Sequence, residues 1–337
     1  MDSTKRGVHA QCAVAVLALS LVAAPVAGQP SAADTAQMRI AVGGVGPGGL
    51  AILDGATFST LARIDGLEQV HGTAISTDGR LAYAMNMVDP DRAVTVIDVE
   101  AGAIVRSVAL PGPSHHAAVS PDGRLYVAYG RMGLDPERPR GIAVLSRHGE
   151  LLETVETAGT AYYLAVSFDA SRLYVAVQHP DRILVLRLPE LEREGAVPLD
   201  APPGHLAVAP GAKALFAVVG SEEVARIDPE KMAVEERIAV GPDAHSVALA
   251  GRPPRLFVGN RVPGSVSVVD PASMAVVETR EMTPMLTHIL ALGDGTLLAS
   301  GGGAREALHL STGTLDVLHR IELPFQPHQS ARAGAVR

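Results

Sequence analysis

Residues 115–130, HHAAVSPDGRLYVAYG, contain two short apolar segments joined by a turn sequence. The first segment is rich in small and β-branched residues, Ser-Pro-Asp-Gly follows at 120–123, and a second apolar run covers 125–128. Proline, glycine and an aspartate that can bond its own backbone are typical of tight turns. The stretch therefore predicts a β-hairpin.

Similar stretches recur along most of the chain, for example STDGRLAYA at 76–84 and SFDASRLYVA at 167–176. When the copies are aligned on their first strand, they start at His71, His115, Tyr162, Gly204, His245, His288 and His328. A spacing of roughly 40 to 47 residues with four short strands per copy is typical of a β-propeller blade. In the first full copy we expect strands over 71–76, 81–85, 94–98 and 104–110.

The two ends of the repeat region complement each other. The copy that begins at His328 has room for one strand only, and the three missing strands are expected at 38–42, 50–54 and 58–64. Pairing 328–336 with 38–42 would close the ring and leave no exposed sheet edge. The sequence thus predicts an all-β, seven-bladed propeller over 38–337, with N- and C-terminal strands sharing one blade.

The recurring hairpins make the chain similar to the YVTN type of seven-bladed β-propeller repeat protein, and this resemblance covers residues 38–337. It implies the fold, but proteins of that type include lyases, lactonase-like enzymes and dehydrogenase subunits, so it does not select an activity. The chain has no tryptophan. That absence separates it from WD40 propellers and from quinone-dependent alcohol dehydrogenases.

The first 28 residues predict an export signal. Lys5 and Arg6 precede an apolar run over 12–24, and small residues lead to Gly28, where we expect cleavage. The run is shorter than a membrane span. Residues 29–37 are expected to be a flexible leader. We therefore expect a periplasmic protein without a membrane anchor, and the only cysteine, Cys12, would leave with the signal.

Charge excludes some partners. The formal net charge is −8, whereas nucleic-acid binding needs a basic face. The glycine clusters at 43–49 and 301–303 follow expected strands and are expected to be blade loops. We therefore expect neither a nucleic-acid partner nor a nucleotide cofactor.

Histidine is concentrated at the start of the innermost strand of each copy, a position that lies at one mouth of a propeller's channel. Twelve histidines in 337 residues would not place five in seven such positions by chance. The predicted metal ligands are His71, His115, His116, His205, His245, His288 and His328, with Met85, Met87, Met132, Tyr162 and His179 as supporting residues. Imidazole and thioether donors favour copper first and zinc second.

The histidine doublet at 115–116 and the single histidines of other copies resemble the copper-binding propeller of nitrous oxide reductase. The resemblance implies a copper site held by histidines. The chain has no cupredoxin domain and, once the predicted signal is removed, no cysteine to receive electrons. Metal storage, delivery or a simpler copper site are therefore the alternatives to the full reductase reaction.

Three alternatives stay open at this stage. Each histidine could have a structural role, bonded to the turn aspartate of its copy (Asp78, Asp122, Asp169 and Asp294). The propeller could bind a periplasmic protein partner without catalysis. It could also be a lyase or hydrolase that uses a channel-mouth histidine as general base on a small ligand.

Overall fold

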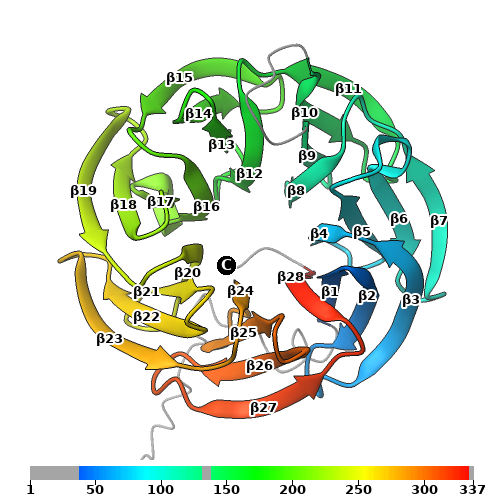
Figure 1. Cartoon of the computed structure of the whole chain (residues 1–337). Coiled ribbons are helices and arrows are strands. Elements are labelled where there is room, and N and C mark those ends of the chain that lie inside the picture. Colours follow the sequence, from blue (N-terminus) through cyan, green and yellow to red (C-terminus); the bar gives the residue numbers. More distant parts are fainter. Residues whose placement is uncertain (1–37, 131–137, 334–337) are drawn as a thin grey trace, which may run out of the picture.

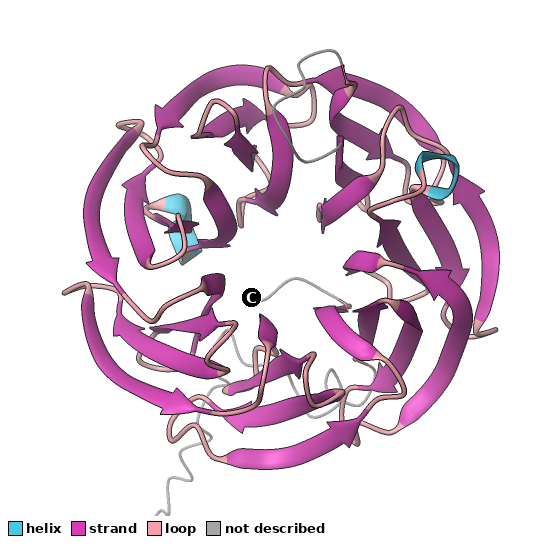
Figure 2. Cartoon of the chain, in the orientation of Figure 1, coloured by secondary structure: helices cyan, strands magenta, loops and turns pink. Residues whose placement is uncertain are grey.

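The computed structural model describes residues 38–130 and 138–333, which form seven four-stranded antiparallel sheets arranged in a ring (Figure 1). The predicted all-β, seven-bladed propeller is confirmed. Figure 2 shows only two helical turns in the described residues, η1 (Pro90–Arg92) and η2 (Pro210–Ala212). Within these residues no helix has the length and apolar character that a membrane crossing requires.

Blades are numbered here from 1 (β4–β7) to 6 (β24–β27), and blade 7 combines β28 with β1–β3. The inner strands are β4 (Val70–Ile75), β8 (Ser114–Val119), β12 (Thr160–Val166), β16 (Pro203–Val208), β20 (Ala244–Ala250), β24 (Leu286–Ala291) and β28 (Gln326–Arg332). The second strands are β5 (Leu81–Asn86), β9 (Leu125–Gly130), β13 (Arg172–Gln178), β17 (Leu215–Val219), β21 (Arg255–Asn260), β25 (Thr296–Gly301) and β1 (Arg39–Val45).

The third strands are β6 (Val94–Asp98), β10 (Arg140–Leu145), β14 (Arg182–Arg187), β18 (Glu223–Asp228), β22 (Ser265–Asp270), β26 (Glu306–Ser311) and β2 (Pro47–Asp54). The outer strands are β7 (Ala103–Val108), β11 (Leu151–Glu156), β15 (Glu192–Pro198), β19 (Ala233–Ala239), β23 (Ala275–Glu281), β27 (Val317–Glu322) and β3 (Thr60–Glu68).

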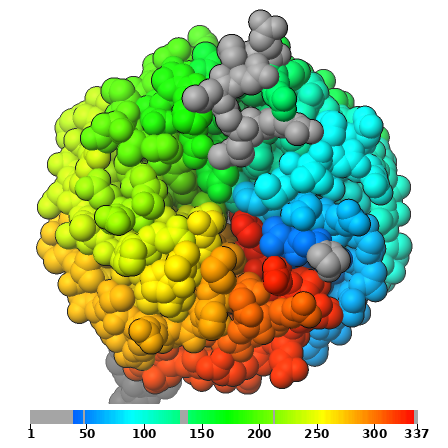
Figure 3. Space-filling model, viewed as in Figure 1, coloured from blue at the N-terminus to red at the C-terminus, as the bar shows by residue number. Residues whose placement is uncertain are grey.

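The ring closes through blade 7, as the sequence predicts. Strand β28 pairs antiparallel with β1, with Val42 opposite Ser330 and Ile40 opposite Arg332. In Figures 1 and 3 the blue N-terminal strands adjoin the red C-terminal strand. This pairing removes two sheet edges that would otherwise be free to pair with another chain.

The core consists of seven hydrophobic clusters, one between each pair of neighbouring blades. The second and third strands are almost entirely buried, whereas outer strands such as β11 are mostly exposed. Side chains of Val, Leu, Ile and Ala dominate, and each fully buried large aliphatic side chain contributes about 1.5–3 kcal/mol. Small aliphatic residues allow these sheets to pack closely without tryptophan.

The turns between inner and second strands explain the recurring Ser-x-Asp pattern. Ser76 Oγ donates to Asp78 (2.7 Å), and the Arg80 amide donates to the same carboxylate (3.1 Å). Ser167 and Asp169 repeat this arrangement in blade 3, at 2.6 Å. The turn aspartates therefore bond within their own turns, and the prediction that they are the partners of the channel histidines is wrong at these positions.

Candidate functional site

Every inner strand carries a β-bulge at the same place. In β4, for example, Val70 lies opposite Asn86 and Gly72 opposite Met85, so His71 is the extra residue. The same shift occurs in β12, β20, β24 and β28, and in β8 and β16 two consecutive residues, His115–His116 and Gly204–His205, lie opposite one. A bulge changes the direction of the side chains at the bulged residues, so two consecutive residues of each inner strand can lie near the channel.

The bulges arrange two rows of residues around the channel. The bulge ring contains His71, His115, Tyr162, Gly204, His245, Thr287 and His328. The floor ring contains the residues that follow them, namely Gly72, His116, Tyr163, His205, Ser246, His288 and Gln329. The structure thus brings all seven predicted histidines together, but in two rows.

Contacts between blades that are not neighbours show that the rings converge on the axis. The centroids of His116 and His205 lie 5.0 Å apart, although blade 3 separates their strands. Those of His205 and His288 lie 5.5 Å apart across blade 5. Within the bulge ring, His71 lies 4.3 Å from His328. The imidazoles therefore pack against one another and fill the channel at this level.

The sequence alignment of blade 6 is wrong by one residue. In β24 the bulged residue is Thr287, and His288 takes the next position, opposite Ser300. The threonine hydroxyl donates to the carbonyl of His328 (2.8 Å), which anchors blade 6 to blade 7. His288 consequently belongs to the floor ring with His116 and His205.

The supporting residues are placed differently from one another. Tyr162 lies in the bulge ring, 5.1 Å from His116 by ring centroids. Met85 is buried in the hydrophobic cluster between blades 1 and 2, Met87 lies in the loop after β5, and His179 lies in an exposed turn after β13. Met132 and the predicted signal and leader, 1–28 and 29–37, lie outside the described residues.

Hydrogen bonds fix the tautomers of three ring histidines. Gln329 Oε1 accepts from the Thr73 amide (2.9 Å), so the same oxygen faces His116 Nδ1 (3.1 Å), which must donate. His328 Nδ1 donates to the His71 carbonyl (2.8 Å), and His115 Nε2 donates to the Gly130 carbonyl (2.5 Å). In each neutral imidazole the other nitrogen then carries a lone pair.

Burial keeps these imidazoles neutral. It holds the pKa of His71, His116 and His205 well below the usual range, and neighbouring imidazoles lower it further because a second positive charge would repel the first. Burial also lowers the pKa of His245 and His288 to about 3. The rings are therefore uncharged at neutral pH.

Several buried ring nitrogens have no hydrogen-bond partner. They are Nδ1 of His71 and His115, and Nε2 of His116, His205 and His245. Unpaired buried polar atoms are costly, so each one calls for an explanation. In residues 38–130 and 138–333, however, no group of three or more His, Cys, Asp or Glu side chains is arranged to hold a metal ion.

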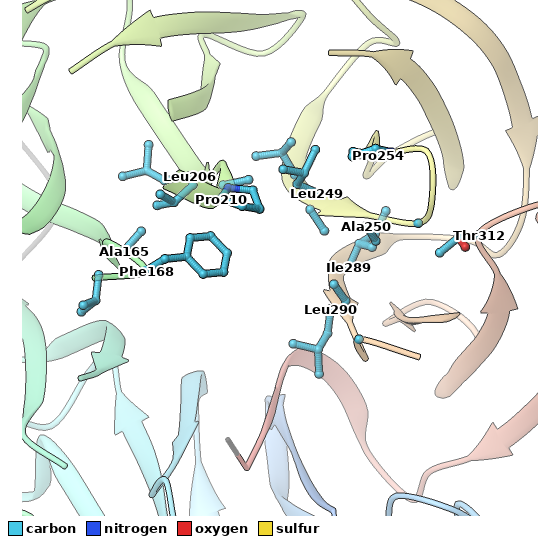
Figure 4. Close-up of a pocket in the computed structure, with 18 of the residues that line it drawn as sticks. Ala165, Phe168, Leu206, Pro210, Leu249, Ala250, Pro254, Ile289, Leu290 and Thr312 are labelled. Atoms are coloured by element: carbon cyan, nitrogen blue, oxygen red, sulfur yellow. The ribbon is translucent and has the colours of Figure 1, made fainter. Parts of the chain in front are cut away.

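On one side of the floor ring the channel widens into a cavity of about 830 Å³, called here the channel well. His288 and Tyr163 line it at the floor, and its walls come from the second halves of the inner strands, with side chains such as Leu206, Leu249 and Ile289 (Figure 4). Phe168, which is 41% exposed, projects over it from the turn of blade 3. A side pocket of about 230 Å³ shares His288 and Tyr163 with the well.

Comparison with known proteins gives one partial family match. Residues 40–190 match the model of the cytochrome D1 heme domain, from β1 to just beyond β14. Among curated proteins none matches this chain in sequence.

Solved structures of low identity share the fold. A 6-phosphogluconolactonase candidate from Bacteroides uniformis has a TM-score of 0.70 at 17% identity and covers 88% of this chain and 100% of its own. Dihydro-heme d1 dehydrogenase NirN has a TM-score of 0.62 at 15% identity, and the match covers 90% of this chain and 77% of NirN. Hydrazine synthase of Kuenenia stuttgartiensis has a TM-score of 0.63 at 15% identity, and the match covers 77% of this chain and 88% of that chain.

These matches correct the cofactor prediction. Copper, with zinc second, is wrong, because the family model is that of a heme domain and one structural neighbour is a heme d1 dehydrogenase. The error has a physical reason. Imidazole binds several metals, and the spacing of histidines in a sequence does not show whether their side chains surround a single ion.

Two parts of the site are absent from the sequence-based prediction. Tyr163 and Gln329 belong to the floor ring, and each directly follows a predicted ring residue. The histidine doublet at 115–116 was the available signal that two consecutive residues of a strand can lie at the channel. The channel well lies beyond the floor ring, at the opposite end of the inner strands from the predicted mouth, and its walls are ordinary apolar strand residues.

Proposed function

We propose that this propeller binds a heme-type tetrapyrrole in the channel well, with floor-ring histidine as the iron ligand. The observation that carries the proposal is an apolar cavity with the neutral imidazole of His288 in its lining, beside the floor-ring residues His116 and His205, whose buried Nε2 atoms have no hydrogen-bond partner. When bound, such a group supplies a redox-active iron that can also bind small ligands. The finer assignment to YVTN-type propellers stays a prediction.

The residues present fit such a group. A macrocycle is large and apolar, and a cavity of about 830 Å³ with aliphatic walls suits a ligand of that kind. The macrocycle itself supplies four ligands to the iron, so the protein needs to present only one or two. The absence of a three-residue ion site among the described residues is therefore compatible with heme iron and disfavours a bare ion.

His288 is the best-placed ligand because it lines the channel well directly. Its Nδ1 accepts a long hydrogen bond from the Ser330 amide (3.4 Å) and lies 3.5 Å from the Ser330 Oγ. In that arrangement the proton of the neutral ring is on Nε2, so ligation through Nε2 would require the other tautomer, in which Nδ1 donates to the Ser330 hydroxyl instead. A ligating histidine normally has its other nitrogen bonded in this way.

Ligation suits these histidines better than general base catalysis does. A general base works best when its pKa is close to the working pH, whereas burial lowers the pKa of His288 to about 3. Such an imidazole is a weak base at neutral pH. It is nevertheless fully available as a neutral ligand, so the lyase or hydrolase alternative is the weaker one.

Spectroscopic titration with hemin tests the proposal. Wild-type protein should bind one hemin per protein molecule and give the shifted absorption band of a histidine-ligated iron. His288→Gly should weaken binding about tenfold or more, and added imidazole should restore the band. His148→Gly, at an exposed turn, is the matched control. Failure of the wild type to bind, or an unchanged spectrum in His288→Gly, would overturn the proposal.

We propose in addition that the protein is exported to the periplasm after cleavage near Gly28. The charged start, apolar run and small residues of 1–28 support this. Mass spectrometry of the protein from its native source should give a chain that begins near Gln29. A chain that retains Met1 in the cytosol contradicts it.

A further inference from the structure

Charge in the channel well contrasts with charge on the protein as a whole. The chain has a formal net charge of −8. Nevertheless, the described residues that line the well and the side pocket include two arginines, Arg252 and Arg332, and no aspartate or glutamate. An apolar cavity with cations as its only charged lining residues has the character of a site for an apolar anion.

Arg332 is the more buried of the two. It ends β28 and lies in the wall of the side pocket between blades 6 and 7. Its Nε donates to the Ala291 carbonyl (3.1 Å) and its Nη1 to the Ala333 carbonyl (3.3 Å). Within the described residues no carboxylate forms an ion pair with it, since Asp294 acts only at longer range and accepts from the Thr296 amide (3.0 Å).

Local backbone makes room for this guanidinium. Gly293, in the turn of blade 6, has a φ of +90°, and a Cβ there would lie 3.3 Å from Arg332 Nη2. Only a residue without a side chain fits this conformation and this neighbour easily. A half-buried guanidinium without a carboxylate is unfavourable unless an anion pairs with it.

Arg252 lines the channel well, which adjoins the side pocket that Arg332 lines. It belongs to the turn that follows β20 in blade 5, it is exposed, and it lines the larger cavity beside Pro254. Blade 6, with Ile289 and Leu290, separates it from Arg332 along the wall. The two cations therefore flank one apolar stretch of wall.

From this arrangement we propose that Arg332 and Arg252 bind carboxylate groups of the ligand, so that the well selects a macrocycle with free acid side chains over its neutral ester. This inference rests on the proposed function for its ligand class. Arg332 provides the main contact because it is half-buried, and so less screened than Arg252, and its guanidinium can form charge-assisted hydrogen bonds. Arg252 provides a weaker contact because water and salt screen it.

Fluorescence titration with metal-free protoporphyrin IX and with its dimethyl ester tests this inference without any iron ligation. Wild-type protein should bind the diacid about tenfold more tightly than the diester. Arg332→Met should remove most of that preference, and Arg332→Lys should keep part of it because it keeps the charge. Arg252→Met should reduce the preference only at low salt. Arg80→Met, on a turn of the same face outside both cavities, should change nothing.

The outcomes separate the two proposals. Equal binding of diacid and diester by the wild type overturns the carboxylate role, even if hemin binds through His288. A clear preference for the diacid that depends on Arg332 supports it, even if hemin shows no histidine ligation. If Arg332→Met fails to fold, the comparison of the two wild-type ligands and the Lys variant still decides.

Discussion

Nδ1 of His116, in blade 2, donates to Oε1 of Gln329, in blade 7, over 3.1 Å. The same oxygen accepts from the Thr73 amide of blade 1. One amide side chain therefore connects three blades at the level of the floor ring, and it directs the lone pair of His116 to Nε2.

Replacing Gln329 by Leu should destabilise the propeller. The change leaves two buried donors, the Thr73 amide and His116 Nδ1, without an acceptor, and each such loss costs about 1–3 kcal/mol. Urea unfolding should show a fall of at least 2 kcal/mol or so. Gln326→Leu, at the exposed start of the same strand, is the control. Equal stability of both variants would mean that the hydrogen bonds of the Gln329 side chain do not stabilise the propeller.

The stability of the ligand-free protein should fall as pH decreases below about 6.5. Above that pH the imidazoles are neutral in both the folded and the unfolded state. Below it the unfolded chain binds protons, whereas burial delays protonation of His328 to about pH 4 and of His245 and His288 to about pH 3 in the folded state. Each such group lowers the free energy of unfolding by up to about 1.4 kcal/mol per pH unit.

Urea unfolding at pH 7.5, 6.0 and 5.0 measures this slope. The variant His288→Gln should have a shallower slope than the wild type, and His148→Gln should match the wild type because His148 is exposed. A stability that stays constant or rises between pH 7.5 and 5.0 would show that the rings are protonated in the folded state.

Gly72→Ala should be strongly destabilising, whereas Gly204→Ala should be tolerated. A Cβ at Gly72 would lie 2.1 Å from the backbone oxygen of His115 and 3.0 Å from Cα of His116, so two inner strands would have to separate. At Gly204 the nearest atom would be 3.4 Å away, which is ordinary contact. Thermal unfolding followed by circular dichroism should show a loss of about 2 kcal/mol or more for the first variant and little change for the second.

Removing residues 326–337 should prevent formation of a closed ring. The truncation deletes β28, exposes the edge of β1 and removes His328 and Gln329 from the rings. Gel filtration should show aggregation or an expanded form. A control that lacks only residues 334–337 keeps every described strand and should elute as the full chain does. A compact, cooperative monomer from the longer truncation would contradict the role given to blade 7.

The sequence predicts the fold well because the repeat is visible in hairpins such as 115–130, and because the single strand at the C-terminal end complements three at the N-terminal end. It predicts which histidines meet for the same reason. It does not predict that His288 lies in the second row, because a bulge shifts register without leaving a mark in composition. Nor does it predict the location of Met85, since a methionine at a strand end can face the channel or the core between blades.

The channel well is harder to foresee. Its walls consist of residues such as Leu206 and Ile289, which are like any other aliphatic strand residues, and only the closed ring turns them towards one space. Arg332 is equally hard to predict, because in the sequence it is one of many arginines, and the absence of a carboxylate partner depends on how blades 6 and 7 pack.

The hydrogen bond between Thr73 and Gln329 joins residues 256 positions apart. Closing so long a stretch of chain is entropically costly, and contacts of this kind slow folding. A nascent chain that still lacks β28 has six blades, an open sheet edge and no complete floor beneath the well. Under the proposed function, a tetrapyrrole would therefore enter the well only once β28 has completed the floor ring.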